Sequence, residues 1–432
     1  MNYQEAMSYI NEVSKLGSVM GLSSMNLLLD LLGNPQDELK VIYIAGTNGK
    51  GSTLAYTSTI LEQAGYKVGR YISPTVIEYL EKIQINQDLI SEEKFALYLT
   101  MIKKACDKIR SQKKLHPTVF EIETALAFLY FYYEACDFVV METGLGGEFD
   151  ATNVIKKPIA TIFTSIGIDH TEFLGDTIRE QATSEAGIIK RGTTVIFGKM
   201  PTVAKEIITN QAKEKRANLR YANPEDLIFE IPKPFEFSQN FYYKGMENLK
   251  TNLLGRHQIY NATLAIETAN LLTEKGYPVS EIAIRSGLEQ TQWFGRLTVI
   301  KDDRKKSGPV VIVDGAHNKD AAKVLAHTLK YLTPNQKIIG IMGVFKDKDL
   351  TGILTQIKPV LHEIYAVGLP DKHRTLTAKT LTSVGQSLGI LTTPFATLED
   401  AINQAYRKAD VVVIFGSLSH LWPATQIVKR LN

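Results

Sequence analysis

The sequence of 432 residues contains little cysteine and no long apolar run. Its two cysteines, Cys106 and Cys136, form no CxxC pair, which argues against a disulfide framework or a zinc cluster and fits reduced thiols. No stretch approaches the ~20 apolar residues of a membrane span. Residues 1–11 are polar and lack the apolar segment of a signal peptide. We therefore expect a cytoplasmic protein without a membrane partner.

Neither sign of charge is in large excess. The formal net charge is +3, and the basic residues form no long run, which argues against a nucleic-acid partner. A mildly positive cleft for an anionic substrate remains compatible with this balance. A hydrophobic content of 44% with 22% charged residues is typical of a globular protein. The length exceeds that of one ordinary hydrophobic core, so two domains are expected.

The most informative stretch is a glycine-rich turn between an apolar strand and a helical pattern. The strand is Val41–Ala45, the helical pattern covers 54–64, and the turn reads Gly46-Thr47-Asn48-Gly49-Lys50-Gly51-Ser52-Thr53. Glycines let backbone N–H groups approach phosphate oxygens, and the helix N-terminus favours the same anion. Lys50 adds a charge for the β- and γ-phosphates, and Ser52 or Thr53 supplies a hydroxyl. We interpret the turn as a nucleotide-binding loop rather than an ordinary turn before a helix.

The rest of the chain alternates between strand and helix patterns, which is typical of an α/β fold with a mainly parallel sheet. The expected strands of the first half lie near 67–72, 137–141, 159–164 and 193–197. Its expected helices lie near 3–32, 91–111, 118–135, 176–189, 258–275 and 279–290. Residues 220–256 suggest a meander of short strands.

A second α/β series follows residues 293–297. Its expected strands lie near 310–313, 337–342, 362–367 and 411–416, and residues 301–306 form a charged hairpin turn before it. We therefore predict two domains. Residues 1–296 would form a P-loop ATPase-like domain with a mainly parallel sheet, and residues 297–432 would form a smaller Rossmann-like α/β domain.

Polar groups follow several of the predicted strands and the loop. Because ligands of open parallel sheets bind at the carboxyl ends of the strands, these groups could converge on one Mg²⁺. Taken singly, a glutamate at a strand end is often solvated, and a lone histidine is more often structural. An imidazole is also an unusual ligand for Mg²⁺. The candidate set is Ser52, Ser73, Glu142 and His170.

Several further motifs occur in a consistent order along the chain. They include Ser73-Pro74, Gly144-Leu-Gly-Gly147, Asp150-Ala-Thr-Asn153, Asp169-His170, His257-Gln-x-x-Asn261, Gly295-Arg296, Asp314-Gly-Ala-His317-Asn318 and Phe415-Gly416-Ser417-Leu418. Together with the shortened loop Gly-Thr-Asn-Gly-Lys-Gly-Ser, they resemble the folylpolyglutamate synthase and dihydrofolate synthase family of the Mur ligase superfamily. The resemblance covers nearly the whole chain.

This resemblance implies an ATP- and Mg²⁺-dependent ligase that adds L-glutamate to a folate through an acyl phosphate. Tetrahydrofolate is the implied acceptor, and dihydropteroate stays open as a second one. The implied protein is a monomer whose partners are small molecules: ATP, L-glutamate and the folate or dihydropteroate.

The resemblance also implies site roles. Residues 46–53, Asn261, Arg296 and Asp314 would contact the nucleotide, and Ser52, Ser73, Glu142 and His170 would hold the metal. His317 and Ser417 would bind glutamate. The residues implied in catalysis are Lys50, Glu142, His170, Glu185 and His317.

Three positions depart from the family pattern. Glu185 stands where family members carry a lysine whose CO₂-derived carbamate helps hold a second Mg²⁺. Thr75 follows Ser-Pro in place of histidine, and Glu148 follows the glycine loop in place of arginine. For Glu185 we keep two hypotheses: a replacement for the carbamate that preserves its negative charge, or a solvated helix carboxylate.

Two other functions remain open from the sequence. A nucleotide-binding regulatory protein that has lost ligase chemistry is supported only by Glu185. A cell-wall amino-acid ligase of the same superfamily is disfavoured because such chains usually carry an additional N-terminal domain, whereas this loop begins at Gly46.

Overall fold

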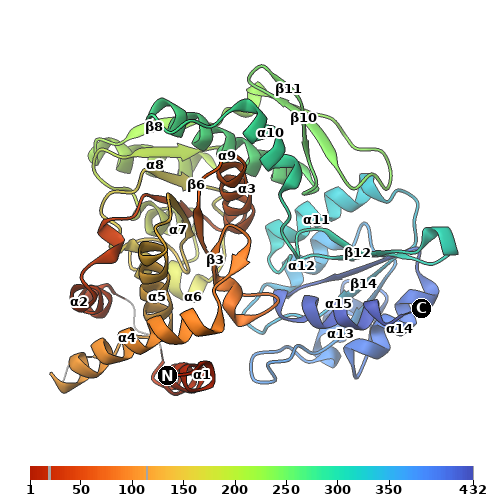
Figure 1. Ribbon diagram of the computed structural model, residues 1–432. Coiled ribbons are helices and arrows are strands. Elements are labelled where there is room, and N and C mark those ends of the chain that lie inside the picture. The colour runs from red at the N-terminus through yellow and green to blue at the C-terminus, as the bar shows by residue number, and fades with distance from the viewer. Residues whose placement is uncertain (18–20, 113–114, 432) are drawn as a thin grey trace. The chain divides into compact units, whose positions relative to one another are not determined.

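The computed structural model describes residues 1–17, 21–112 and 115–431 and divides into two compact units (Figure 1). The N-terminal unit comprises Met1–Glu225 and Tyr260–Leu288, and the C-terminal unit comprises Asp226–Ile259 and Glu289–Asn432. The chain therefore passes between the units three times, whereas the sequence analysis divides it once, after residue 296. No helix among the described residues is both long enough and apolar enough to cross a membrane.

An eight-stranded sheet forms the centre of the N-terminal unit. Its strand order is β4-β3-β2-β5-β1-β6-β7-β8, and all neighbours from β2 to β8 are parallel. The short strands β3 and β4 add an antiparallel edge, which the sequence analysis did not predict. The mainly parallel α/β prediction is confirmed. The strands are β1 (Val41–Ala45), β2 (Val68–Tyr71), β3 (Ile83–Ile85), β4 (Asp88–Leu89), β5 (Phe138–Glu142), β6 (Ala160–Phe163), β7 (Thr194–Phe197) and β8 (Asn218–Tyr221).

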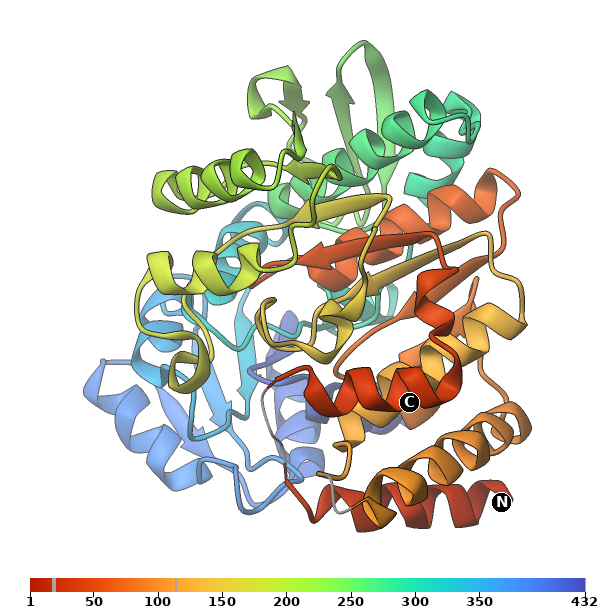
Figure 2. The ribbon, with the colours of Figure 1, turned by 90° about the vertical axis from the view of Figure 1, so that its left-hand side faces the viewer.

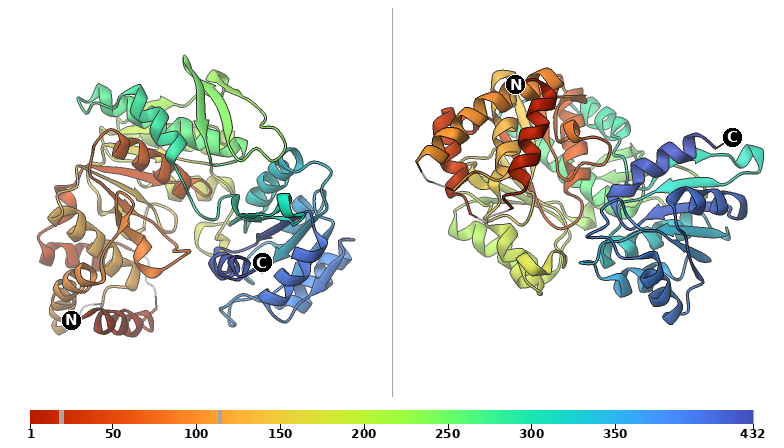
Figure 3. Two further views of the ribbon diagram at one scale, coloured as in Figure 1. Left: turned by 45° about the vertical axis from the view of Figure 1, so that its right-hand side comes forward. Right: turned by 90° about the horizontal axis from the view of Figure 1, so that it is seen from below.

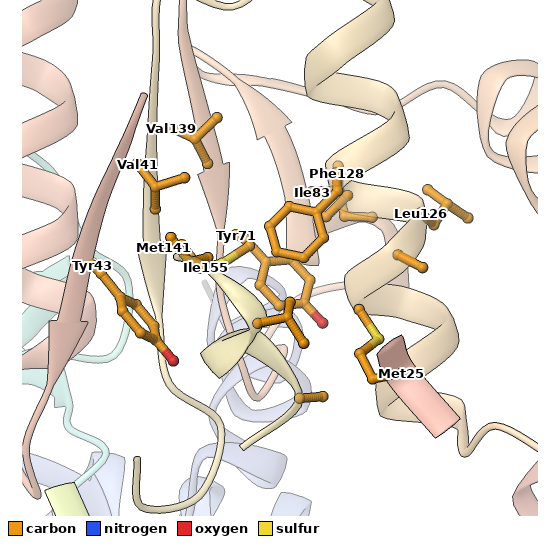
Figure 4. Close-up of a cluster of buried hydrophobic side chains, with 14 of the residues drawn as sticks. Met25, Val41, Tyr43, Tyr71, Ile83, Leu126, Phe128, Val139, Met141 and Ile155 are labelled. Atoms are coloured by element: carbon orange, nitrogen blue, oxygen red, sulfur yellow. The ribbon is translucent and has the colours of Figure 1, made fainter. Parts of the chain in front are cut away.

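Strand alternation sorts the side chains of this sheet onto two faces. Val41 and Tyr43 of β1 and Val139 and Met141 of β5 belong to one core cluster, together with residues of α2 and α5 (Figure 4). Because successive side chains of a strand point to opposite faces, Glu142 lies on the other face. That face carries α3, which packs against β1, β2 and β5. The register therefore puts the carboxylate of β5 on the side of the helix that follows the phosphate loop.

Helices cover both faces of this sheet. The helix α5 is apolar nearly all round and buried from Glu121 to Phe131, as the sequence predicts. Figure 2 shows α1 and α4 lying side by side, and both pack against α5. The helix α8, which the sequence analysis did not predict, packs against α7. The helices are α1 (Tyr3–Ser14), α2 (Ser23–Leu32), α3 (Lys50–Gln63), α4 (Glu92–Ser111), α5 (Val119–Tyr133), α6 (Thr171–Leu174), α7 (Ile178–Ala186), α8 (Thr202–Glu214), α9 (Arg256–Glu274) and α10 (Glu281–Gln290).

The C-terminal unit contains a six-stranded sheet of order β12-β13-β17-β14-β15-β16, drawn from teal to blue in Figure 3. Only β12 is antiparallel, and it forms the predicted hairpin with β13. The strands are β12 (Thr298–Asp302), β13 (Val310–Val313), β14 (Ile338–Met342), β15 (Glu363–Ala366), β16 (Thr392–Pro394) and β17 (Val411–Phe415). The helices are α11 (Lys319–Leu332), α12 (Leu350–Ile357), α13 (Ala378–Ser387), α14 (Leu398–Lys408) and α15 (Leu421–Lys429).

The strand order has a functional consequence. The chain leaves β13 and builds β14, β15 and β16 outward before β17 returns between β13 and β14. Loops after β13 and β17 therefore meet at the carboxyl edge of the sheet, where ligands of open α/β sheets bind. The same unit holds the predicted meander as an antiparallel sheet of β9 (Leu227–Phe229), β10 (Gln239–Tyr243) and β11 (Met246–Thr251).

Candidate active site

The phosphate loop adopts backbone conformations that only glycine adopts readily. Gly46 has φ 131° and Gly49 has φ 99°. A Cβ on Gly46 would lie 2.2 Å from Thr164 Oγ1, and one on Gly49 would lie 2.6 Å from Asn261 Oδ1. The helix α3 begins directly afterwards, at Lys50, whose Nζ donates to Gly46 O at 2.6 Å. The loop is thus a strand–turn–helix unit in contact with Asn261 of α9.

The segment after β6 fixes the conformation of this loop. Thr47 N donates to Ser165 O at 2.8 Å, and Ser165 Oγ donates to Asn48 O at 2.9 Å. Gly167 N donates to Thr47 Oγ1 at 2.9 Å. All these bonds lie within the protein, so the loop conformation is set by the chain itself. The sequence analysis missed this role of Ser165, because nothing in the local pattern relates it to a loop more than a hundred residues earlier.

Glu142 and Ser73 meet at the carboxyl edge of the N-terminal sheet. Glu142 is the last residue of β5 and is only 4% exposed. Its Oε1 accepts the N–H of Ser73 at 2.6 Å, and Thr143 N donates to Ile44 O, which ties the ends of β5 and β1 together. Ser52 lies buried in the first turn of α3. The structure therefore brings Ser73 and Glu142 into direct contact at the strand edge that carries the phosphate loop.

His170 lies in a different setting. It is exposed, has φ 49° at the N-cap of α6, and its N–H donates to Asp169 Oδ1 at 2.8 Å. Gln181 holds the preceding loop, because its Nε2 donates to Asp169 O and Gly175 O. In the described parts of the chain, no group of three or more His, Cys, Asp or Glu side chains is arranged to hold a metal. The predicted set includes only two residues of those types, so its role as a metal site stays a prediction.

Asp150 organises the loop from Thr143 to Asn153. Its carboxylate accepts N–H groups from Gly144, Leu145 and Thr152 at 2.9–3.0 Å. Burial raises the pKa of this carboxyl, and the hydrogen bonds oppose that rise. The loop packs closely on α7, because a Cβ on Gly147 would lie 2.6 Å from Glu185 O. The sequence analysis gave Asp150 only as part of a motif.

Glu185 is buried, with 3% of its surface exposed. The hypothesis of a solvated helix carboxylate is therefore wrong. Burial raises the pKa of Glu185, whereas the charge of Lys50 and a hydrogen bond from the Gly46 N–H lower it. The carboxylate thus faces the first residues of the phosphate loop.

In the C-terminal unit, Arg296 and Asp314 are neighbours. Asp314 accepts the N–H of Leu297 and that of Ala316, both at 2.8 Å. Gly315 N donates to Gly295 O at 2.7 Å, and a Cβ on Gly315 would lie 2.8 Å from Arg296 Nη1. The turn after β13 therefore holds the guanidinium of Arg296 close to Asp314.

His317 and Ser417 follow the adjacent strands β13 and β17. Gly416 N donates to Ala316 O at 3.0 Å and joins the two loops. His317 Nδ1 lies 2.8 Å from Gly315 O; because a carbonyl only accepts, this nitrogen carries the proton and Nε2 of the neutral ring is an acceptor. Ser417 is buried, and its Oγ lies 3.0 Å from Ser419 Oγ. The structure therefore brings these two predicted glutamate-site residues to one sheet edge.

Comparison with known proteins agrees with this architecture. Residues 44–269 match the Mur ligase middle domain, and residues 295–418 match the Mur ligase glutamate ligase domain. The fold and the matched domains make the chain a Mur ligase.

Relatives and solved structures define the family more narrowly. The chain is 37% identical to dihydrofolate synthase/folylpolyglutamate synthase of Bacillus subtilis, with 84% of each chain covered. It is 33% identical to folylpolyglutamate synthase of Lacticaseibacillus casei, with 87% of each covered. The structure of E. coli FolC in complex with DHPP and ADP matches with a TM-score of 0.85 and 29% identity, covering 98% of this chain and 97% of that one. The chain belongs to the folylpolyglutamate synthase and dihydrofolate synthase family.

Proposed function

We propose that this chain is an ATP-dependent ligase that joins L-glutamate to the carboxylate of a folate, with tetrahydrofolate as acceptor and dihydropteroate as a possible second one. The observation that carries the proposal is the phosphate loop after β1, next to the strand β5 that ends in Glu142. The relatives that match most of this chain are named as synthases. Such an enzyme would act as a cytoplasmic monomer.

In this reaction the protein must neutralise the negative charge of the phosphates, and it need not form a covalent bond to either substrate. The folate carboxylate attacks the γ-phosphate of ATP and becomes an acyl phosphate as ADP leaves. The glutamate amine then attacks the acyl carbon, displaces phosphate and loses a proton as the amide forms. Lys50 lies at the start of α3, and its ammonium group donates to Gly46 O. When that bond breaks, the ammonium group can contact the transferring phosphoryl group. Asn261 lies against the loop and would contact the nucleotide. Arg296 and Asp314 are the expected nucleotide contacts of the C-terminal unit.

Mg²⁺ bound with ATP would spread the charge of the transferring phosphoryl group. The residues proposed to hold it are Ser52, Ser73, Glu142 and His170. The hydroxyl and carboxylate oxygens of this set suit Mg²⁺, and the contact between Ser73 and Glu142 supports their joint role. The imidazole of His170 suits it less well.

Glutamate would bind in the C-terminal unit. His317 Nε2 offers an acceptor for the ammonium group, and Ser417 Oγ offers a hydroxyl for a carboxylate. This assignment extends the proposed division of the chain into an ATP-binding domain, residues 1–296, and a glutamate-binding domain, residues 297–432.

A substrate panel tests the proposal. ADP release is measured with dihydropteroate, tetrahydrofolate and its one-carbon forms, each with and without glutamate, and product masses are recorded. We expect ADP release that depends on both glutamate and a folate, with products heavier by whole glutamyl residues. Nucleotide binding without any glutamate-dependent ADP release would contradict the proposal and favour a regulatory protein that has lost ligase chemistry.

A further inference from the structure

The connection between β2 and β3, residues 72–82, is a closed loop that we call the β2–β3 loop. Its two ends lie side by side, because β2 and β3 pair in antiparallel fashion and Ile72 N donates to Lys82 O at 3.0 Å. The first residue beyond this closure is Ser73, whose N–H donates to Glu142 Oε1. Whatever fixes the loop therefore also fixes Ser73 on Glu142.

The interior of the loop is filled by a carboxylate of the loop itself. Glu81 is buried and accepts the N–H groups of Val76 and Ile77. Burial raises the pKa of Glu81, and these hydrogen bonds oppose that rise. Because the bonds join the tip of the loop to its base, residues 73–81 are held together as one compact turn.

A second carboxylate holds the loop from outside. Glu123 of α5 is 3% exposed, accepts a hydrogen bond from the hydroxyl of Tyr79, and pairs with the ammonium group of Lys82 at 2.5 Å. Lys82 Nζ also lies 4.7 Å from the centroid of the Tyr79 ring, and that ring packs edge-on against Phe95 of α4. One end of the loop is thus fixed to two helices, and the other end carries Ser73.

The burial of Glu123 is not explained by the helix that carries it. The helix α5 is apolar nearly all round, and Glu121 already completes its capping box by accepting the N–H of Thr118. An apolar side chain at position 123 would avoid the cost of removing a charge from water. A charged hydrogen-bond acceptor fixes the direction of its donors as well as their distance. The carboxylate therefore sets the orientation of the loop, which apolar packing alone would leave less defined.

We propose that Glu123 is a positioning residue for the site at the end of β5. Through Tyr79 and Lys82 it holds the β2–β3 loop in the orientation that keeps Ser73 on Glu142. Its effect reaches the site through the loop and not through contact with a substrate. The inference rests on the proposed function only for its effect on catalysis, because the contacts of the loop lie within the protein.

The first experiment compares wild type with Glu123→Gln, which removes the charge and keeps the shape. Amide hydrogen exchange at residues 73–77 is measured in protein free of metal and nucleotide. Glu267→Gln is the matched control, because Glu267 is also buried in the N-terminal unit and pairs with Arg220 at 2.6 Å. We expect exchange in this segment to be at least about tenfold faster in Glu123→Gln and unchanged in Glu267→Gln.

Kinetics separate positioning from a contribution to stability alone. At a temperature where both variants are folded, Glu123→Gln should raise the Mg²⁺ concentration for half-maximal ADP release by about tenfold, with unchanged AMPPCP affinity. Glu267→Gln should change neither quantity. Lys82→Arg keeps the ion pair and should behave as wild type in both experiments. Unchanged exchange at residues 73–77 in Glu123→Gln, or an unchanged Mg²⁺ requirement, would overturn the inference.

A milder variant covers the case in which Glu123→Gln does not fold. Tyr79→Phe removes one of the two donors to Glu123 and keeps the ring, and the same two readouts and the same contradicting outcomes apply to it. If the wild type shows no glutamate-dependent ADP release, the proposed function is contradicted. The exchange measurement on the empty protein then still decides whether Glu123 holds the loop.

Discussion

The two sheets of the molecule both end in polar loops, but the loops are built from different kinds of groups. At the edge of the N-terminal sheet, the carboxylates of Glu142, Asp150 and Glu185 are buried beside a glycine-rich loop. At the edge of the C-terminal sheet, His317 and Ser417 are held by hydrogen bonds to residues two positions away. The first edge concentrates carboxylates. At the second, Asp314 lies beside the guanidinium of Arg296, and local turns fix the imidazole of His317 and the hydroxyl of Ser417.

This difference shows where the chain accepts an electrostatic cost. Buried carboxylates destabilise a protein unless cations or N–H groups compensate them. The N-terminal edge accepts this cost where a nucleotide with its metal ion would compensate it. At the C-terminal edge the chain itself compensates the carboxylate of Asp314, through the charge of Arg296 and the N–H groups of Leu297 and Ala316. Changes at the first edge should therefore act on nucleotide and metal, and changes at His317 and Ser417 of the second edge should act on glutamate.

The largest effect is expected for Lys50→Ala. Removing this charge from the phosphate loop should lower kcat by about 10³-fold, because such a group stabilises the transferring phosphoryl charge. The measurement is glutamate-dependent ADP release, with folding checked by thermal unfolding. Lys156→Ala is the control, since Lys156 is an exposed cation that pairs with Asp37. A folded Lys50→Ala enzyme with near-normal turnover would remove the loop from the mechanism.

A smaller effect is expected for Glu142 and Ser73, which meet at the end of β5. Glu142→Ala should weaken the apparent Mg²⁺ affinity by about 10²-fold, and Ser73→Ala should weaken it less, because a carboxylate brings full charge and a hydroxyl only a dipole. The measurement is the Mg²⁺ dependence of ADP release in both variants. If Ser73→Ala proved the more damaging change, Glu142 would not be a metal ligand.

His317→Ala tests the loops at the carboxyl edge of the C-terminal sheet. Loss of one hydrogen bond to a charged substrate group should raise the KM for glutamate by about tenfold or lower kcat, while ATP affinity changes little. Steady-state kinetics with glutamate and separate titration with AMPPCP measure the two effects. A selective loss of nucleotide affinity would place His317 in the nucleotide site and remove the contrast between the edges.

A further effect concerns stability in acid rather than activity. His420 follows Ser417 in the C-terminal unit, is 1% exposed, and burial lowers its pKa from 6.5 to about 4. The folded state therefore binds this proton less readily than the unfolded state, and stability is lost as the pH falls from 6.5 towards 4, by up to about 3 kcal/mol. His420→Leu should remove this contribution. Thermal unfolding of both proteins across that pH range tests it, and parallel curves would contradict it.

Local patterns made much of this architecture predictable. The phosphate loop, the buried α5 and the strands on either side of the predicted hairpin each depend on short-range spacing, and the structure places them where the sequence predicts. Contacts between residues far apart in the sequence were not predictable. Examples are the hydrogen bond from Thr47 N to Ser165 O and the close approach of Asn261 to Gly49. Nor was α8, whose buried face contains only three residues, Ala204, Ile208 and Ala212.

Glu185 illustrates the same limit within the site. Its helix contains mostly polar residues, so the local sequence is compatible with a solvated surface. Burial follows only from the packing of the loop around Gly147 and the phosphate loop against α7. The family pattern shows that position 185 is unusual, but only the fold shows that its carboxylate is buried.

The central claim, ligation through an acyl phosphate, is tested most directly by following the carboxylate oxygen. A tetrahydrofolate labelled with heavy oxygen in its terminal carboxylate is incubated with the wild-type protein, ATP and glutamate, and the released phosphate is analysed by mass spectrometry. We predict one heavy oxygen in each phosphate released, with glutamate incorporated in equal amount. Phosphate that carries no label, released while glutamate is incorporated, would contradict the account.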